Sequence, residues 1–270
     1  SVVPLARWFA PTLRPPRSWL GQPDRSLGEG LADSGVMAPA RDRLLVPFLS
    51  GVVLGDPLAV SEQFVRLVVR SMALAAPGVP AQGMTALPHQ LAAGLAEAVE
   101  LNRVVRGVAR DGEGWRVQAD DASEVAKAVV IATDARAAGE LAGTPVPAMH
   151  GCVTDWFACP AAPSPTRLVC IDSRAGAVLA NTAVMSNVAP SYAPAGGHLV
   201  QATCVWRDGE APPSVADVQH AAGDVYQADP SAWRHLVRHE IRDALPAQPP
   251  PLEPRRDVAL GDGRFVCGDH

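Results

Sequence analysis

The sequence predicts a mixed α/β fold, an α+β mixture in which helices, a βα unit and an antiparallel sheet follow one another. Three observations favour it: helical spacing of apolar residues over about residues 1–75, an apolar run before an alanine-rich segment near residue 130, and alternating segments between residues 150 and 206. The 270 residues, 48% of them hydrophobic, can bury a substantial core as one large domain or two ordinary ones.

The first part of the chain is expected to be mainly helical. The first helix ends at Pro15-Pro16, because proline lacks a backbone donor and disfavours helix in the residue before it. Ser26 and Glu29 have the spacing of a capping box, which marks the start of the second. Apolar spacings of three and four residues complete the prediction of helices over residues 5–13, 26–35, 38–49 and 61–75.

The middle of the chain changes its period. A short helix over residues 87–98 precedes a β-hairpin over residues 99–119, which turns at the glycine-rich residues 111–114. Residues 126–132 form a continuous apolar run, typical of a strand buried on both faces of a parallel sheet. Thr133-Asp134 and an alanine-rich helix follow, so this segment predicts a βα unit.

The last part predicts an antiparallel sheet. Its expected strands cover residues 152–159, 167–171, 178–185 and 198–206. Ser214 begins a helix that ends near Gln227, and the proline-rich residues 246–254 indicate an extended linker. Residues 232–245 are ambiguous, because their helix propensity is fair while their apolar and polar residues alternate.

Composition excludes several classes of protein. The chain has 23 basic and 28 acidic residues, and its basic residues form no stripe in the sequence. No nucleic-acid partner is therefore expected. The apolar stretches are far shorter than the ~20 residues that cross a bilayer, so we expect a cytoplasmic protein. Its five widely spaced cysteines favour reduced core thiols. Contact with a membrane surface and the oligomeric state stay open.

Motifs for metal binding and hydrolysis are weak or absent, and no metal is expected. His235, His239 and Glu240 lie close in sequence, but glutamate follows the second histidine, whereas the zinc motif needs it beside the first. No Cys-x-x-Cys pair and no Gly-x-Ser-x-Gly occur. Gly-x-Gly-x-x-Gly is also absent, and Gly112-x-Gly114 is interpreted as turn chemistry.

Several segments taken in order nevertheless resemble one family. They cover nearly the whole chain and are Pro47-Phe48-Leu49-Ser50-Gly51-Val52, Pro80-Ala81-Gln82-Gly83-Met84, Val105-x-x-Val108, Val129-Val130-Ile131-Ala132-Thr133, Ala189-Pro190-x-Tyr192-Ala193-Pro194, Ala244-Leu245-Pro246-Ala247 and Phe265-Val266-Cys267-Gly268-Asp269. This order is similar to the FAD-dependent amine oxidase, phytoene desaturase and protoporphyrinogen oxidase superfamily. The resemblance implies FAD as cofactor.

The resemblance also implies cofactor-binding residues. The strand of Val105 is similar to one whose backbone pairs with the adenine edge, and Thr133 lies in a turn near the phosphates. Gly268 and Asp269 resemble a closing Gly-Asp beside the ribityl and pyrophosphate groups. Two positions depart from the family pattern. Asp134 replaces a glycine and adds a carboxylate near the phosphates, and Gln82 replaces the first glycine of Gly-Gly-Met.

The implied architecture is a partial FAD-binding Rossmann-like domain with a substrate domain of helices and an antiparallel sheet. Residues 1–80 form the helical part of the substrate domain, 81–145 an FAD-domain segment, 146–248 the substrate-domain sheet, and 249–270 a linker with the final FAD-domain strand. In this interpretation residues 233–241 are a strand. The resemblance places the glycine motif before Ser1 and a further helix after His270, so we expect the 270-residue chain by itself to bind FAD poorly and to be inactive.

The implied reaction is transfer of a hydride from an apolar small-molecule substrate to the flavin, as in a desaturase or a porphyrinogen oxidase. No catalytic acid or base is identified. Flavin amine oxidation is disfavoured, because residues 246–265 offer only Phe265 for the aromatic cage that amines occupy. Two alternatives stay open: a non-catalytic scaffold that has lost the cofactor, and a carrier that binds an apolar small molecule.

Overall fold

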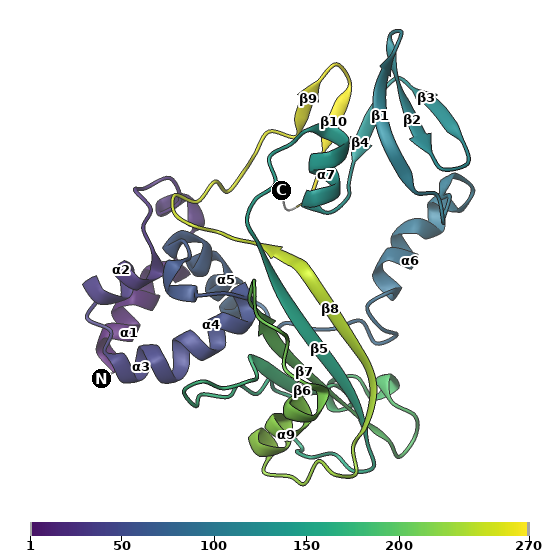
Figure 1. Ribbon diagram of the computed structural model, residues 1–270. Coiled ribbons are helices and arrows are strands. Elements are labelled where there is room, and N and C mark those ends of the chain that lie inside the picture. Colours follow the sequence, from purple (N-terminus) through teal and green to yellow (C-terminus); the bar gives the residue numbers. More distant parts are fainter. Residues whose placement is uncertain (1, 269–270) are drawn as a thin grey trace. The chain divides into compact units, whose positions relative to one another are not determined.

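The computed structural model describes residues 2–268, without the side chains of Val2, Ala96 and Glu97. The chain divides into two compact units, each built from two separate segments (Figure 1). Residues up to Ala86 with Met149–Leu252 form the first unit, and Leu87–Ala148 with the residues from Glu253 onward form the second. The functional names expected for these parts stay predictions.

The first unit begins with the expected helices. They are α1 (Val2–Phe9), α2 (Leu27–Asp33), α3 (Ala38–Ala40), α4 (Val46–Val53) and α5 (Glu62–Leu74), with a π-helical turn over Arg41–Leu45 between α3 and α4. Ser26 and Glu29 form the predicted capping box, and the Ser61 side chain caps α5. The predicted end of the third helix was wrong: the helical path continues to Val53, and Leu54 ends it in the left-handed conformation.

Four antiparallel strands complete the first unit. They are β5 (Met149–Cys159), β6 (Asn181–Val184), β7 (His198–Trp206) and β8 (Arg234–Pro246), in the order β6-β7-β5-β8. The short helix α8 (Met185–Val188) follows β6, and α9 (Val215–Tyr226) packs on one face of the sheet. β8 confirms the strand interpretation of residues 233–241. The strand predicted over residues 167–171 is wrong, because only Cys170 forms a bridge, to Thr182.

The second unit holds two small sheets. The first contains β1 (Val105–Asp111), β2 (Gly114–Ala119) and β3 (Ser123–Ala126), and the second has the order β4-β10-β9. These strands are β4 (Val129–Ile131), β9 (Ala259–Gly261) and β10 (Arg264–Val266), accompanied by α6 (Ala86–Ala92) and α7 (Ala135–Ala142). The Trp115 indole joins the two sheets, because its Nε1 donates to the Asp262 carbonyl at 2.7 Å.

The predicted strand over residues 126–132 needs correction. The chain divides it into β3, which pairs with β2, and β4, which pairs in parallel with β10. The parallel pairing is therefore confirmed, but burial on both faces is not, since the Val130 side chain is 61% exposed. The cause is local: β4 has three residues and lies at the edge of its sheet.

The five cysteines are free thiols, and three of them are buried. Burial raises the pKa of Cys159 and of Cys204 to about 12, so both stay protonated and unreactive at neutral pH. The described residues contain no helix with the length and apolarity that a bilayer span requires.

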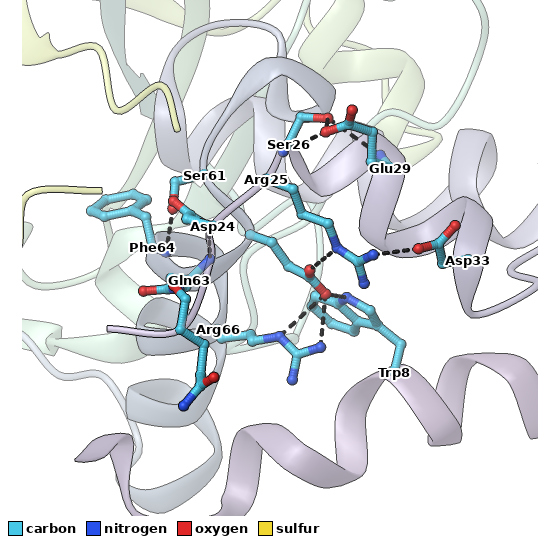
Figure 2. A network of polar contacts seen from close by, with 12 residues as sticks. Trp8, Asp24, Arg25, Ser26, Glu29, Asp33, Ser61, Gln63, Phe64 and Arg66 are labelled. Carbon is cyan, nitrogen blue, oxygen red and sulfur yellow. Dashed lines mark hydrogen bonds and ion pairs between the residues drawn. The ribbon is translucent and has the colours of Figure 1, made fainter. Parts of the chain in front are cut away.

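A buried carboxylate ties the helices of the first unit together. The side chain of Glu62, at the start of α5, accepts hydrogen bonds from Trp8 Nε1 at 2.8 Å, Arg25 Nε at 2.7 Å and Arg66 Nη2 at 2.7 Å. Figure 2 shows Trp8, Arg25 and Arg66 converging on this point from three segments. Gly30 of α2 faces the same carboxylate so closely that a Cβ there would lie 2.3 Å from Glu62 Cδ.

Replacing this carboxylate with a neutral amide is expected to destabilise the helical part. Burial by itself would raise the pKa of Glu62, but hydrogen bonds and charge from Arg25 and Arg66 outweigh it and lower that pKa. We expect Glu62→Gln to cost about 2 kcal/mol of unfolding free energy at pH 7, measured by urea denaturation, because two arginines lose their counterion.

The pH dependence follows from the sign of this shift. Since the folded pKa lies below the usual value of about 4.3, the stabilisation is present above that pH and is lost as the pH falls through the folded value. The difference between wild type and Glu62→Gln should therefore shrink in acid. Asp33→Asn, at the exposed partner of Arg25, is the control and should cost about 0.5 kcal/mol or less. Equal costs for both variants would contradict the assignment.

Candidate functional site

Two of the predicted cofactor residues meet at one edge of a sheet. In the parallel pair, Ile131 of β4 lies opposite Val266 of β10, and the Cys267 amide donates to the Ile131 carbonyl at 2.9 Å. Thr133 and Gly268 each follow their strand by two residues. They therefore lie side by side at the carboxyl edge of the pair, where ligands bind in open α/β sheets.

The backbone at this edge is open to a ligand. Both Thr133 and Gly268 are exposed, and Gly268 has a φ of +149°, a conformation that favours glycine. The Thr133 hydroxyl donates only to the neighbouring Asp134 carbonyl, at 3.2 Å. Asp269, the fourth predicted residue, lies outside the described residues.

Asp134 gives this edge a feature that works against phosphate. Its Oδ1 accepts hydrogen bonds from the amides of Arg136 and Ala137, each at 3.0 Å, and so caps α7. Two amides that a helix N-terminus could offer to an anion are thereby occupied, and a carboxylate stands beside them. Asp134, where the sequence departs from the family pattern, therefore disfavours a phosphate at the N-terminus of α7.

Val105 lies elsewhere in the same unit, at the start of β1. β1 is an edge strand, and the Val104 carbonyl accepts from the Asp120 amide on the β2 side at 3.2 Å. Successive backbone groups of a strand point to opposite edges, so the amide and carbonyl of Val105 face the unpaired edge. This geometry suits backbone pairing with a planar ligand. The Val105 side chain is 37% exposed.

Two segments that carry the family resemblance contact each other in the first unit. The Tyr192 hydroxyl donates to the Pro80 carbonyl at 2.8 Å, and the Ser191 hydroxyl donates to the Ala81 carbonyl. These bonds hold the segment that leads into Gln82 and Gly83, where Gly83 has a φ of +94°. Two of the motifs that carry the resemblance, residues 80–84 and 189–194, therefore meet in space.

A row of hydrogen-bonding side chains crosses the face of the four-stranded sheet opposite α9. Cross-strand register aligns His239 with Thr154, Thr154 with Thr203, and Thr203 with Asn181. The hydroxyls of Thr154 and Thr203 are hydrogen-bonded at 2.8 Å. We call these four residues the polar row. No carboxylate belongs to it.

Apolar side chains flank the polar row. The neighbouring register line holds Val237, Trp156 and Ala183 with one polar side chain, Gln201, whose Nε2 donates to Asn181 Oδ1 at 3.3 Å and to Thr203 Oγ1. Ile241 of the line on the other side is 48% exposed. Trp156 Nε1 donates to His239 Nδ1 at 3.1 Å. Since indole is only a donor, Nδ1 acts as the acceptor, and the neutral imidazole carries its proton on Nε2.

The polar row ends at α4. Gly51 lies so close to Asn181 that a Cβ at this position would stand 2.8 Å from Asn181 Nδ2. A glycine in the helix therefore permits α4 to approach the sheet at the end of the row. The sequence indicates Gly51 as part of a motif but does not predict the polar row. The alternation of polar and apolar residues around Thr154 and Thr203 is the signal that could have indicated a polar face of the sheet.

The two histidines considered for metal binding lie on opposite faces of the sheet. β8 carries an extra residue at Leu236, which shifts the register so that His235 lies opposite Phe157 and His239 opposite Thr154. His235 Nε2 contacts Asp155 Oδ1 at 2.9 Å, and Arg238 binds the same buried carboxylate with two nitrogens at 2.9 and 2.7 Å. No cluster of three metal-ligating side chains occurs among the described residues.

The helical part of the first unit contains an apolar cavity of about 430 Å³. α1, the helical path through the π-turn and α4, and α5 line it, and it is open to solvent on one side. Its lining consists of Leu5, Ala6, Trp8, Phe9, Leu44, Leu45, Phe48, Leu49 and Val69.

Comparison with solved structures finds the same fold in several oxidoreductases. The chain is similar to an oxidoreductase from Methanosarcina mazei, with a TM-score of 0.71, 13% identity, and coverage of 98% of this chain and 66% of that one. For a candidate protoporphyrinogen oxidase from Exiguobacterium sp. 255-15 the TM-score is 0.61, with 19% identity and coverage of 89% and 60%. For a putrescine oxidase the TM-score is 0.64, with 15% identity and coverage of 98% of this chain and 68% of that one.

These likenesses concern the fold, and the chain spans about three fifths to two thirds of the length of these structures. The sequence pattern of the flavin containing amine oxidoreductases matches residues 16–225. The chain belongs to this family. The predicted superfamily, the mixed fold and the flavin cofactor are thereby confirmed. A search among curated proteins found no match.

The residues present fit the cofactor at two places and not at a third. The carboxyl edge offers the exposed backbone of Gly268 and the Thr133 hydroxyl to a sugar–phosphate chain, and the outer edge of β1 offers backbone groups to a base. The N-terminus of α7 does not fit a phosphate, because Asp134 already caps it. Binding residues are thus expected at Gly268, Thr133 and Val105.

Two substitutions of Asp134 separate its capping role from its charge. Serine is also a good N-cap, so Asp134→Ser should leave stability almost unchanged, whereas Asp134→Ala should cost about 1 kcal/mol by thermal or urea unfolding. Because serine also removes the charge, Asp134→Ser should bind FAD more tightly than wild type in a flavin-fluorescence titration. Weaker binding by Asp134→Ser would show that the carboxylate assists the cofactor.

Proposed function

We propose that this chain is part of an FAD-dependent oxidoreductase that takes a hydride from a mostly apolar small molecule, as a desaturase or a porphyrinogen oxidase does. The observation that carries the proposal is the carboxyl edge of β4 and β10, where Thr133 and the positive-φ Gly268 lie together in a chain of the flavin containing amine oxidoreductase family. A cytoplasmic location is part of the same proposal.

The work is divided between the cofactor and the chain. Bound flavin supplies the hydride acceptor. The chain contributes position: Gly268 lets its backbone approach the ligand because it has no Cβ, Thr133 offers a hydroxyl, and Val105 offers edge backbone groups. Each hydride transfer in such an oxidation also releases a proton from the substrate, for which solvent water is a sufficient acceptor.

The polar row supports an uncharged or weakly polar substrate. Its members offer hydroxyl, amide and imidazole groups between apolar side chains, and none offers a carboxylate to a cationic amine. His239, fixed by Trp156, would donate from Nε2 to an acceptor on the substrate. These features favour a flat apolar body with a hydrogen-bonding group over a diamine.

One alternative has a specific observation behind it. Asp134 occupies the amides beside the proposed phosphate position. This arrangement would suit a protein that keeps the fold, has lost the cofactor and binds a small molecule without turnover. Flavin amine oxidation is the second alternative. It is weaker, since Phe265 is the sole aromatic residue within residues 246–265 and the polar row lacks a counterion.

Cofactor binding tests the first part of the proposal. Titrated with FAD and followed by flavin fluorescence, the 270-residue chain should show weak but saturable binding. Gly268→Val should weaken it about tenfold or more, because a branched side chain is strained at this φ and blocks the approach. Gly209→Val is the matched control: it also replaces an exposed glycine of positive φ, and it lies in the first unit. Equal affinity of wild type and Gly268→Val would refute the placement.

Turnover tests the second part. Turnover by the 270-residue chain should be slow, because it binds FAD poorly by itself. With saturating FAD, its residual oxidation of protoporphyrinogen to fluorescent porphyrin should still be at least tenfold faster than its oxidation of putrescine, because the polar row offers amines no counterion. Faster oxidation of putrescine would favour the amine oxidase alternative, and oxidation of neither compound above the rate of FAD without protein would favour the non-catalytic relative.

A further inference from the structure

The apolar cavity of the helical part has a lining without free polar atoms. Of its lining side chains only Trp8 carries a nitrogen or oxygen, and Trp8 Nε1 donates to Glu62 at 2.8 Å. The indole N–H is thus turned away and occupied. A ligand in this cavity finds no hydrogen-bonding side chain, so only an apolar group can replace water there without loss.

The cavity wall is held rigidly. Trp8 is 2% exposed, and the Glu62 carboxylate that fixes it is itself held by Arg25 and Arg66. The Arg66 guanidinium also stacks over the Trp8 ring, 5.5 Å from its centroid. Figure 2 shows Trp8 with Arg25 and Arg66 in this polar network. A wall fixed in this way favours a preformed site over a void that could collapse.

The opposite wall contains the π-helical turn. The Val46 amide donates to the Arg41 carbonyl, five residues back, so the helix widens over Arg41–Leu45. This turn places Leu44 and Leu45 in the lining, and the Leu44 side chain is 51% exposed. Single π-turns within helices are uncommon and occur frequently at functional sites. The turn is a second observation, independent of volume, that points to a ligand here.

From these features we infer that the cavity binds the hydrocarbon part of a small ligand, an alkyl or isoprenyl chain, with its more polar end towards solvent beside Leu44. The volume of about 430 Å³ lies within the range of about 300–1,000 Å³ that small-molecule pockets have. The site belongs wholly to the helical part of the first unit, so its occupancy does not depend on flavin.

The test uses the neutral fluorophore N-phenyl-1-naphthylamine, whose emission rises in apolar surroundings, with the 270-residue chain in the absence of FAD. We expect saturable binding of one probe per chain and competitive displacement by farnesol and by 1-dodecanol. Ala6→Phe is the decisive variant, because Ala6 is exposed and lines the cavity, so a phenyl ring fills the mouth without disturbing the core. Probe affinity should fall at least tenfold.

Two further variants sharpen the result. Ala32→Phe, at an exposed helical alanine outside the lining, is the matched control and should bind like wild type. Val69→Thr keeps the volume and adds a hydroxyl to the lining, so it should weaken binding by several-fold while the circular dichroism spectrum is unchanged.

Three outcomes would overturn the inference. They are the absence of saturable probe binding, equal binding by wild type and Ala6→Phe, and a concentration-dependent dimer in sedimentation that Ala6→Phe dissociates, which would assign this surface to a second copy of the chain. Because the assay contains no flavin, each of these outcomes is separate from failure of the proposed oxidoreductase function.

Discussion

The parallel pairing of β4 with β10 is the interaction on which the second unit depends. It joins residues 129–131 to residues 264–266, so that two segments far apart in the sequence form one sheet. Trp115 strengthens this junction: its indole bonds to the Asp262 carbonyl, and the Arg264 guanidinium lies 4.4 Å from the ring centroid. Without the pairing, Thr133 and Gly268 would have no reason to lie together.

The first unit is organised by two buried carboxylates of different surroundings. Glu62 joins α5 to α1 through Trp8 and to the segment before α2 through Arg25, and Asp155 joins β5 to β8 through Arg238 and His235. Each charge is compensated within hydrogen-bond distance, as burial requires. Neither carboxylate lines the two candidate binding surfaces, the apolar cavity and the polar row. Both surfaces are therefore free of the negative charge of Glu62 and Asp155.

Local signals predicted most of the elements. The capping box at Ser26, the cap at Ser214 and the alternation within residues 198–206 each depend on neighbours in sequence, and each is present as expected. The failures occur where distant contacts decide. Whether residues 126–132 make one strand or two depends on β2 and β10 competing for them, and no local pattern contains that information.

The prediction of the candidate site shows the same contrast between local signals and distant contacts. The likeness of motifs indicated Thr133 and Gly268 because glycine and small residues at strand ends are visible in a sequence. The polar row was missed because it is defined by register across four strands, where each member alone is an ordinary alternating residue. The role of Asp134 as a helix cap is predictable from its position before an alanine-rich helix, because aspartate is a preferred N-cap residue.

The extra residue in β8 decides which face of the sheet His235 occupies. In a regular strand, histidines four residues apart share a face, so His235 would lie on the face of His239. The bulge at Leu236 instead turns His235 to Asp155 and leaves His239 with Trp156. One inserted residue thus gives the buried Asp155 carboxylate a second partner, and its deletion would leave that charge to Arg238 alone.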